Sequence, residues 1–276
     1  MINYGIVAHG GAGSPDAYSN GCKAACEAGF RLLESGQTSL ATVVEAVRLL
    51  ENDERFNAGY GSVLRIDGKT IEMDAAVMDS TGNIGIVINV RHVKNPILLA
   101  QAVLSTPHVA LCGRGAEKYA KEIGFKPFYR IAAQSVKKFN KMKKAVEVGE
   151  FDVFWTKDAD TVGAVALDRN GVFALATSTG GAAPMMIGRV GDTPMIGCGF
   201  FCGEHGAVAV TGLGEEIIRR MPAKVVHDLL TTGQTESACQ RGVELFTSRT
   251  GIIAISRDGH SVVSNTGMAS WAIVSG

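Results

Sequence analysis

The chain has 276 residues, of which 46% are hydrophobic and 20% charged, so it can bury a large core as a single domain. Lysine plus arginine and aspartate plus glutamate number 27 each, which leaves no basic surplus to attract nucleic acid. Residues 1–11 lack the pattern of a secretory signal, and no uncharged apolar run approaches the ~20 residues of a membrane helix. We therefore expect a cytoplasmic protein that binds neither nucleic acid nor membrane.

The first half alternates short apolar strands, glycine-rich turns and amphipathic helices. Residues 4–8 form an expected buried strand that runs into the glycine-rich segment His9–Gly13. Apolar residues recur at helical spacing over Asp16–Glu34, and again after Ser39, which we expect to cap the second helix. A second glycine-rich turn, Phe56–Gly61, precedes two more strands. The expected strands are Ile71–Met78 and Ile84–Val90, joined at Ser80–Asn83, and the expected helices that follow are Pro96–Leu104 and Gly115–Ile123.

Two features of the chain allow interpretations other than a purely structural role. The cysteine pairs Cys22/Cys26 and Cys198/Cys202 have C-x3-C spacing. No nearby His or Cys pair completes a zinc site, so we interpret them as small buried hydrophobes. From about 127 to 160 the apolar pattern weakens, which is typical of a solvated helix face or a mobile linker. That segment carries a basic run, Lys137, Lys138, Lys141, Lys143 and Lys144.

The apolar pattern returns at Thr161. Strands are expected at Val162–Leu167 and Val172–Thr177, because Asn170-Gly171 between them is a strong hairpin signal. The strand Val208–Thr211 runs into a helix from Glu215, whose acidic start opposes the positive end of the helix dipole. The remaining elements are a helix at Glu236–Phe246 and strands at Ile252–Ser256 and Ser261–Ser264 around Asp258-Gly259. Strands arranged mainly as hairpins predict an α+β fold, and a four-layer αββα sandwich fits them.

Thr161 lies between the weakly patterned segment and a buried strand. From position alone it is an ordinary strand-opening threonine. A threonine hydroxyl needs a base to become a nucleophile, and an N-terminal threonine carries one in its own α-amine, with a reference pKa near ~8. Chain cleavage between Asp160 and Thr161 would create that terminus, leaving the nucleophile anchored by the sheet.

Three later segments place suitable groups behind Thr161. Thr177 and Thr179 return hydroxyls toward the start of the first strand of the hairpin. Arg189 and Asp192 supply a cation and an anion three residues apart, which suit the carboxylate and ammonium of an amino acid. The alternative for that pair is a surface salt bridge of little energy. Thr211 and Gly212 end a strand before a helix, where a hydroxyl and an N–H can stabilise an oxyanion.

These segments occur together in one order. The motifs HGGAG, FNAGYGSVL, MDAAVMD, DTVGAVALD, ATSTGG, GRVGDTP and TGLGEEIIR resemble the plant-type L-asparaginase/isoaspartyl aminopeptidase family of N-terminal-nucleophile hydrolases, from about residue 5 to residue 219. The resemblance implies hydrolysis of asparagine or β-aspartyl dipeptides. It also implies autocatalytic cleavage into 1–160 and 161–276, and a homodimer of the resulting αβ units. No cofactor is expected for catalysis.

The resemblance also assigns roles to individual residues. Thr161 matches the nucleophile, Thr179 the second active-site threonine with Thr177 in support, and Thr211 with Gly212 the oxyanion hole. Arg189 matches the substrate-carboxylate clamp and Asp192 the acceptor for the substrate amine, while Gly10 and Asn57 match positions that line the site. The family's structural sodium implies backbone-carbonyl ligands at Leu50, Glu51, Asp53, Phe56, Ala58 and Tyr60.

Departures and rivals keep some alternatives open. The family often has other residues before the nucleophile than Ala159-Asp160, although a glycosylasparaginase branch cuts at Asp-Thr. Leu213 stands where a threonine is frequent, which affects substrate preference. A glycosylasparaginase or a threonine endopeptidase on the same scaffold is the nearest rival. A glycine-loop nucleotide-binding module is remote, because Gly68-Lys69-Thr70 lacks the earlier P-loop glycine.

Overall fold

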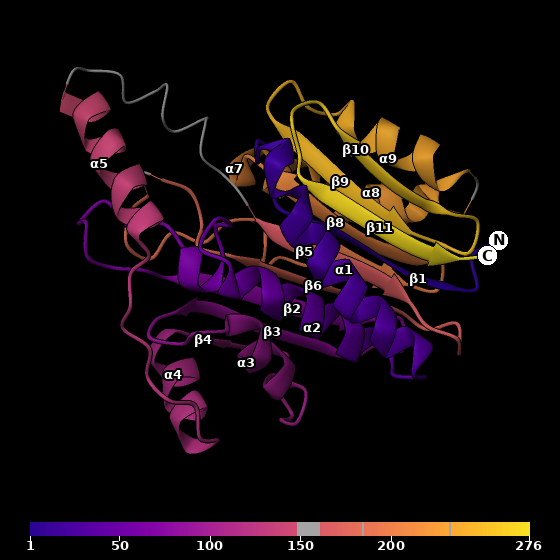
Figure 1. Cartoon of the computed structure of the whole chain (residues 1–276), viewed down its shortest axis with the longest axis horizontal. Coiled ribbons are helices and arrows are strands. Elements are labelled where there is room, and N and C mark those ends of the chain that lie inside the picture. Colours follow the sequence, from indigo (N-terminus) through magenta and orange to yellow (C-terminus); the bar gives the residue numbers. More distant parts are fainter. Residues whose placement is uncertain (148–160, 184, 232) are drawn as a thin grey trace.

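The computed structural model describes residues 1–147, 161–183, 185–231 and 233–276, and it confirms the expected mixture of helices and sheets (Figure 1). Within these residues one sheet has the strand order β11-β1-β5-β6-β2-β3-β4 and the other β10-β9-β8-β7. The strands are β1 Tyr4–His9, β2 Met73–Asp79, β3 Ile84–Val90, β4 Ala110–Cys112, β5 Val162–Leu167, β6 Phe173–Thr179, β7 Phe200–Gly203, β8 Gly206–Gly212, β9 Thr250–Ile255, β10 His260–Ser264 and β11 Ser270–Ser275.

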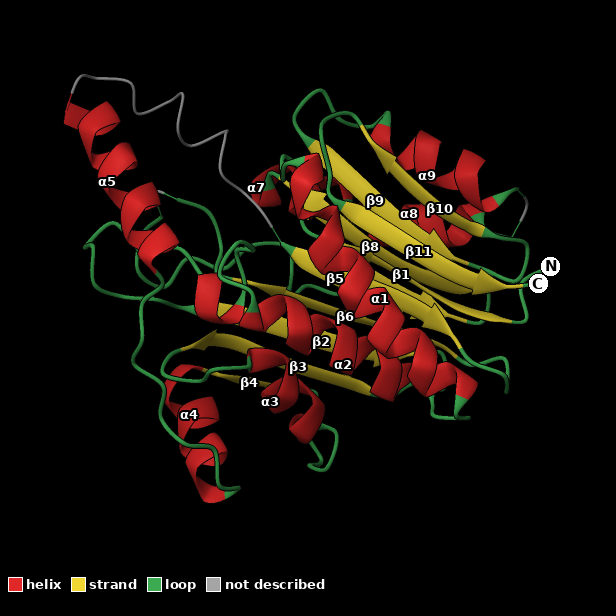
Figure 2. Cartoon of the chain, viewed as in Figure 1, coloured by secondary structure: helices red, strands yellow, loops and turns green. Residues whose placement is uncertain are grey.

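Helices cover the outer faces of both sheets, while α5 extends away from them (Figure 2). They are α1 Ser19–Glu34, α2 Ser39–Asn52, α3 Pro96–Val103, α4 Gly113–Glu122, α5 Ala133–Glu147, α7 Gly214–Arg220, α8 Pro222–Leu229 and α9 Thr235–Val243, with short 3₁₀ helices η1 Asp16–Tyr18 and η2 Gly59–Gly61. The buried side chains of α1 to α4 pack on the larger sheet, and those of α8 and α9 pack on the smaller. A third cluster, including Val165, Leu175 and Ile253, fills the space between the two sheets.

The β5–β6 hairpin places the expected nucleophile at the edge of this core. Val162 lies opposite Ser178 and Gly163 opposite Thr177, so the start of β5 lies beside the end of β6. The turn between the strands contains Gly171, whose φ of 79° favours glycine. β5 pairs with β1 on one side and with β6 on the other. Thr161 therefore directly precedes a strand that is hydrogen-bonded along both edges.

Most expected elements occur, with three corrections. Thr38, not Ser39, caps α2, because its hydroxyl accepts from the Ala41 backbone N–H at 3.2 Å. The Ser39 N–H instead donates to Asp168 at 2.9 Å. The predicted helix from Asp16 is divided into η1 and α1. The second strand of the hairpin extends to Thr179, two residues beyond the predicted end. Thr177, Ser178 and Thr179 therefore all lie within β6.

The expected burial of the cysteine pairs is confirmed. Cys22 and Cys26 are fully buried on α1, and their thiols lie 3.5 Å and 3.3 Å from the carbonyls of Ala269 and Trp271 on the neighbouring chain segment. Burial raises the pKa of Cys22 to about 12. Both thiols are therefore protonated packing groups at neutral pH, as a small hydrophobe would be.

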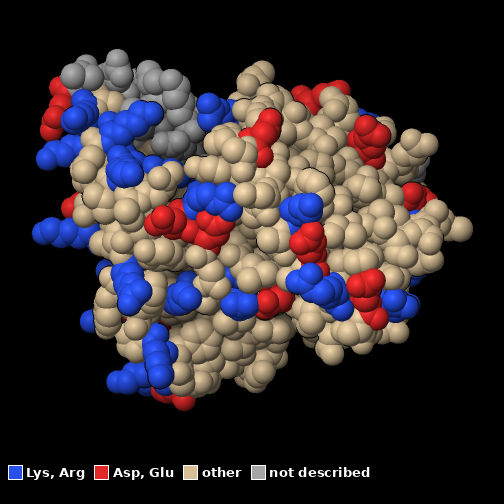
Figure 3. All heavy atoms as spheres, viewed as in Figure 1, with Lys and Arg blue, Asp and Glu red and all other residues tan. Residues whose placement is uncertain are grey.

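The basic run of the weakly patterned segment lies on α5. Four of its five lysines are exposed, while Met142 and Ala145 on the same helix are buried, which agrees with the solvated helix face. Figure 3 shows basic side chains at the end of the molecule where α4 and α5 lie, and mixed charges elsewhere on that face. Residues 148–160, including Asp160, lie outside the described residues. Among the residues that are described, no helix is long and apolar enough to cross a membrane.

Candidate active site

A small cavity lies where β5 and β6 meet the loop before β7 and the start of α7. It has a volume of about 10 Å³, roughly the space of one water molecule. Five residues of the sequence prediction share it: Thr161, Thr179, Arg189, Asp192 and Gly212. The complete lining is Thr161, Thr179, Gly181, Ala182, Arg189, Gly191, Asp192, Thr193, Gly212 and Gly214.

The Thr161 side chain is buried, with 5% of its surface exposed. Its Oγ1 lies 3.2 Å from Oγ1 of Thr193, and either hydroxyl can donate. The Thr193 carbonyl in turn accepts a hydrogen bond from the Thr177 hydroxyl at 3.2 Å. Thr177 therefore supports the cavity from behind. Thr193 was missed by the sequence interpretation, although it directly follows Asp192.

Thr179 ends β6 and begins a tight turn. Its hydroxyl accepts a hydrogen bond from the Gly181 N–H at 2.9 Å. Asn57 holds the same turn from the other side, because its carbonyl accepts from the Gly180 N–H at 2.9 Å and its side-chain amide donates to the Gly181 carbonyl. Asn57 is thus a support for the turn that follows Thr179, and it does not line the cavity.

Arg189 is held by a carboxylate that the sequence interpretation assigned only to a helix dipole. Its Nε and Nη2 each donate to Glu215 at 2.8 Å, in a forked pair that fixes the guanidinium plane. Nη1 has no hydrogen-bond partner among the described residues and lies beside Gly191. A Cβ added to Gly214 would lie 2.7 Å from Arg189 Nη2, so the guanidinium would have to shift if this residue were not glycine. The fork leaves one guanidinium edge available for a second carboxylate.

Asp192 is 4% exposed, and its Oδ2 has no hydrogen-bond partner within the described part of the chain. Desolvation raises the pKa of this carboxyl to about 7, although the nearby Arg189 charge opposes the rise. A buried acceptor without a donor is costly. Its arrangement suits a ligand that brings a cation into the cavity.

Thr211, Gly212 and Gly10 lie behind or beside the cavity. The Thr211 oxygen accepts a hydrogen bond from the Ala12 N–H at 3.2 Å, which ties β8 to the glycine-rich segment after β1. Gly212 lines the cavity with a φ of 152°, and an added Cβ would lie 2.3 Å from the Arg249 carbonyl oxygen. Gly10 does not line it. A Cβ there would lie 2.3 Å from the Phe56 ring, so this glycine permits close packing of that ring.

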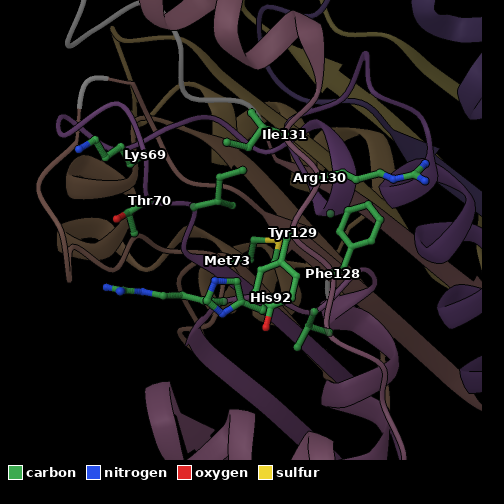
Figure 4. A pocket seen from close by; sticks show the side chains of 12 residues that line it. Lys69, Thr70, Met73, His92, Phe128, Tyr129, Arg130 and Ile131 are labelled. Carbon is green, nitrogen blue, oxygen red and sulfur yellow. The ribbon is translucent and has the colours of Figure 1, made fainter.

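A larger cavity, of about 250 Å³, lies elsewhere (Figure 4). It is bounded by the segments around Lys69, Arg91 and Phe128, and the His92 and Tyr129 rings lie together with centroids 4.7 Å apart. Figure 4 shows the Arg130 side chain extending away from it. None of the residues predicted for catalysis lines this cavity. The chemistry expected of Thr161 therefore belongs to the smaller one.

Comparison with known proteins identifies the family of the chain. Residues 2–276 match the family model Asparaginase_2, described as asparaginase. The chain belongs to the asparaginase family. It is 38% identical to the isoaspartyl peptidase/L-asparaginase of Mus musculus, with 98% of this chain and 87% of the relative covered. It is 39% identical to the plant-type L-asparaginase of Pyrococcus horikoshii (88% and 85% covered) and 40% identical to that of Pyrobaculum calidifontis (89% and 86% covered).

The asparaginase-family resemblance also predicted a sodium loop, whose carbonyls extend from the last turn of α2 into η2. The carbonyls of Leu50, Asp53, Phe56 and Ala58 each accept one backbone N–H within this loop, which leaves a second lone pair on each oxygen. A Cβ on Gly59 would lie 2.6 Å from the Glu51 carbonyl, and one on Gly61 would lie 2.1 Å from that of Phe56. Carbonyl oxygens converging on a glycine turn are the donor type that a hard cation prefers.

Proposed function

We propose that this asparaginase-family protein hydrolyses β-aspartyl amide bonds through Thr161, after cleaving its own chain between Asp160 and Thr161. The observation that carries the proposal is the shared cavity of Thr161, Arg189 and Asp192. A nucleophile, a carboxylate-binding cation and an ammonium acceptor there match the three reactive parts of asparagine or a β-aspartyl dipeptide. The relatives are named as L-asparaginases or as isoaspartyl peptidases, and these names support the same substrate class.

Chain cleavage comes first in the proposed mechanism. The Thr161 hydroxyl attacks the carbonyl of Asp160, the acyl group moves from nitrogen to oxygen, and water hydrolyses the ester. Fragments 1–160 and 161–276 then remain together through the shared core.

In catalysis the free amine of Thr161 takes the proton of its own hydroxyl, and the oxygen attacks the side-chain amide carbon. The Gly212 N–H and the Thr211 hydroxyl stabilise the oxyanion. The hydrogen bond from Ala12 uses an oxygen lone pair of Thr211, which leaves the hydroxyl hydrogen to donate. Ammonia or an amino acid leaves, and water hydrolyses the β-aspartyl ester.

Substrate orientation comes from the charged pair. The α-carboxylate binds the Nη1 side of Arg189, because Glu215 already holds the Nε edge. The α-ammonium donates to Asp192 Oδ2, the acceptor that has no partner among the described residues. Thr179 lines the same cavity, and we propose that its hydroxyl acts beside the reacting atoms during both cleavage and turnover.

The proposal is tested by the intact mass and N-terminal sequence of the purified protein. We expect fragments beginning at Thr161, and a single uncut chain for Thr161→Ala. Assays of asparagine, β-aspartyl dipeptides and glycosylasparagine then separate the β-aspartyl activity from a glycosylasparaginase, and a peptide panel tests for a threonine endopeptidase. An uncut wild-type chain that is nevertheless fully active contradicts the mechanism.

Several finer features belong to the same proposal. The three hydrophobic clusters support a four-layer αββα sandwich as the proposed architecture. We also propose that the mature αβ unit forms a homodimer in the cytoplasm. The sodium loop is proposed to hold Na⁺ through the carbonyls of Leu50, Glu51, Asp53, Phe56, Ala58 and Tyr60. The ion would act structurally there. It would fix the loop that carries Asn57 and hence the turn after Thr179, with no part in bond cleavage.

A further inference from the structure

Arg65 is a fully buried arginine that lies outside the candidate active site. Its guanidinium donates three hydrogen bonds to oxygen atoms: Nε to Glu72 Oε2 at 3.1 Å, Nη2 to the Glu72 carbonyl at 2.6 Å, and Nη1 to the Gly180 carbonyl at 2.7 Å. Nη1 also contacts the Met185 sulfur at 3.9 Å. A buried guanidinium is costly to desolvate even when it is paired. We therefore expect the function of Arg65 to lie in the contacts that its guanidinium makes.

Glu72 continues the connection on the other side. Its Oε2 also accepts a hydrogen bond from the Gly188 N–H at 2.7 Å, and its Oε1 accepts from Arg91. Gly188 directly precedes Arg189, and Gly180 directly follows Thr179. One buried ion pair therefore contacts the backbone beside two residues of the cavity.

We infer that Arg65 and Glu72 together are positioning residues for the reaction, one fixing the turn after Thr179 and the other the backbone before Arg189. This inference rests on the proposed function. Replacing a buried ion pair by well-packed apolar residues is often neutral or stabilising, so pairing energy alone does not account for its presence. Its specific effect is geometric, because each partner also holds a main-chain group of a catalytic segment.

The two contacts have separable consequences. Loss of the Glu72 contact to Gly188 lets the backbone of Arg189 shift, which weakens recognition of the substrate α-carboxylate. Loss of the Arg65 contact to Gly180 loosens the turn that holds Thr179, which slows both chain cleavage and turnover. The Glu72 contact is expected to leave chain cleavage unchanged, because that step has no substrate carboxylate.

The decisive measurement is equilibrium binding of L-aspartate and of β-alanine, which is aspartate without the α-carboxylate, to the mature protein. The ratio of their dissociation constants reports what the α-carboxylate contributes. We expect wild type to favour L-aspartate strongly, and Glu72→Gln to reduce that ratio by about tenfold or more, the equivalent of one lost charge-assisted hydrogen bond. A general loss of structure would weaken both ligands alike and leave the ratio unchanged.

The double variant Arg65→Met/Glu72→Met guards against misfolding, because it leaves no unpaired buried charge. It is expected to lose the same discrimination, and also to show a lower kcat and slower chain cleavage. Arg48→Lys is the matched control, since Arg48 forms a forked pair with Glu45 on the surface of α2. It should behave as wild type.

The outcomes separate the two hypotheses. If wild type binds L-aspartate no better than β-alanine, the assignment of Arg189 fails and the proposed function fails with it. If wild type discriminates and the folded double variant discriminates equally well, the positioning role of Arg65 and Glu72 is wrong. Reduced discrimination in the folded double variant, with Arg48→Lys unchanged, supports it.

Discussion

Gly214 is the first residue of α7 and lies against Arg189 and Asp192, the two charged residues proposed to bind the substrate. A Cβ added there would lie 2.7 Å from Arg189 Nη2 and 2.9 Å from Asp192 Oδ1. Because carbon contacts are comfortable only from about 3.5 Å, one or both groups must move by roughly 0.6–0.8 Å in Gly214→Ala. A displacement of this size in a positioning group costs about 10- to 100-fold in catalytic efficiency.

The assay is kcat/KM for asparagine and for a β-aspartyl dipeptide, with the extent of chain cleavage measured on the same preparation. We expect KM to carry most of the loss, and cleavage to remain complete. Gly115→Ala is the matched control, because Gly115 lies in the first turn of α4 with open space around its Cβ position. That variant should gain up to ~1 kcal/mol in stability with no change in activity. A wild-type KM for Gly214→Ala would refute the proposed closeness of the clamp.

Three other predictions concern neighbouring groups. Because burial raises the pKa of Asp192 to about 7, the ammonium acceptor is protonated below that pH, so KM should rise as the pH falls through 7. This is measured as a pH profile of KM. The same group affects stability in the opposite sense, since a raised folded-state pKa contributes most below about pH 4 and its contribution is lost as the pH rises through 7. Glu215→Gln removes the charge that orients Arg189 and should raise KM by about tenfold, the cost of one charge-assisted hydrogen bond, with kcat nearly unchanged in steady-state assays. Thr211→Val should lower kcat by ~10²–10³ with little change in KM, and an equal loss in substrate binding would count against its oxyanion role.

The place of Thr161 before a buried strand could be predicted from sequence because the hairpin has a local signature, whereas its role as nucleophile was predicted from the family resemblance. The Asn170-Gly171 turn fixes the hairpin, and the hairpin register brings the end of β6 beside the residue before β5. The closeness of Arg189 and Asp192 was also predictable, since they stand three residues apart in a glycine-rich segment, and the resemblance assigned their roles. In each case the information lies within a few residues of the chain.

The groups that complete the site could not be predicted in this way. Glu215 was interpreted as a helix-dipole residue, and only the approach of α7 to the loop before β7 makes it the partner of Arg189. Thr193 contacts Thr161 across 32 residues of sequence, and Arg65 reaches Gly180 across 115. Strand β11 was missed for the same reason, because its pairing with β1 joins the two ends of the chain (Figure 1).

The arrangement of Glu215, Arg189 and Asp192 also bears on substrate selectivity. Had Arg189 paired with Asp192, the two charges would have satisfied each other, and a substrate would first have to separate them. Glu215 takes one edge of the guanidinium instead, so Asp192 keeps an acceptor without a partner among the described residues and a pKa near 7. An α-amino acid brings both counter-charges at once. A ligand lacking the ammonium leaves the buried Asp192 oxygen without a donor, and one lacking the carboxylate leaves the Nη1 edge of Arg189 without an acceptor. The proposed selectivity for amino-acid substrates thus follows from one carboxylate oxygen and one guanidinium edge that have no partner among the described residues.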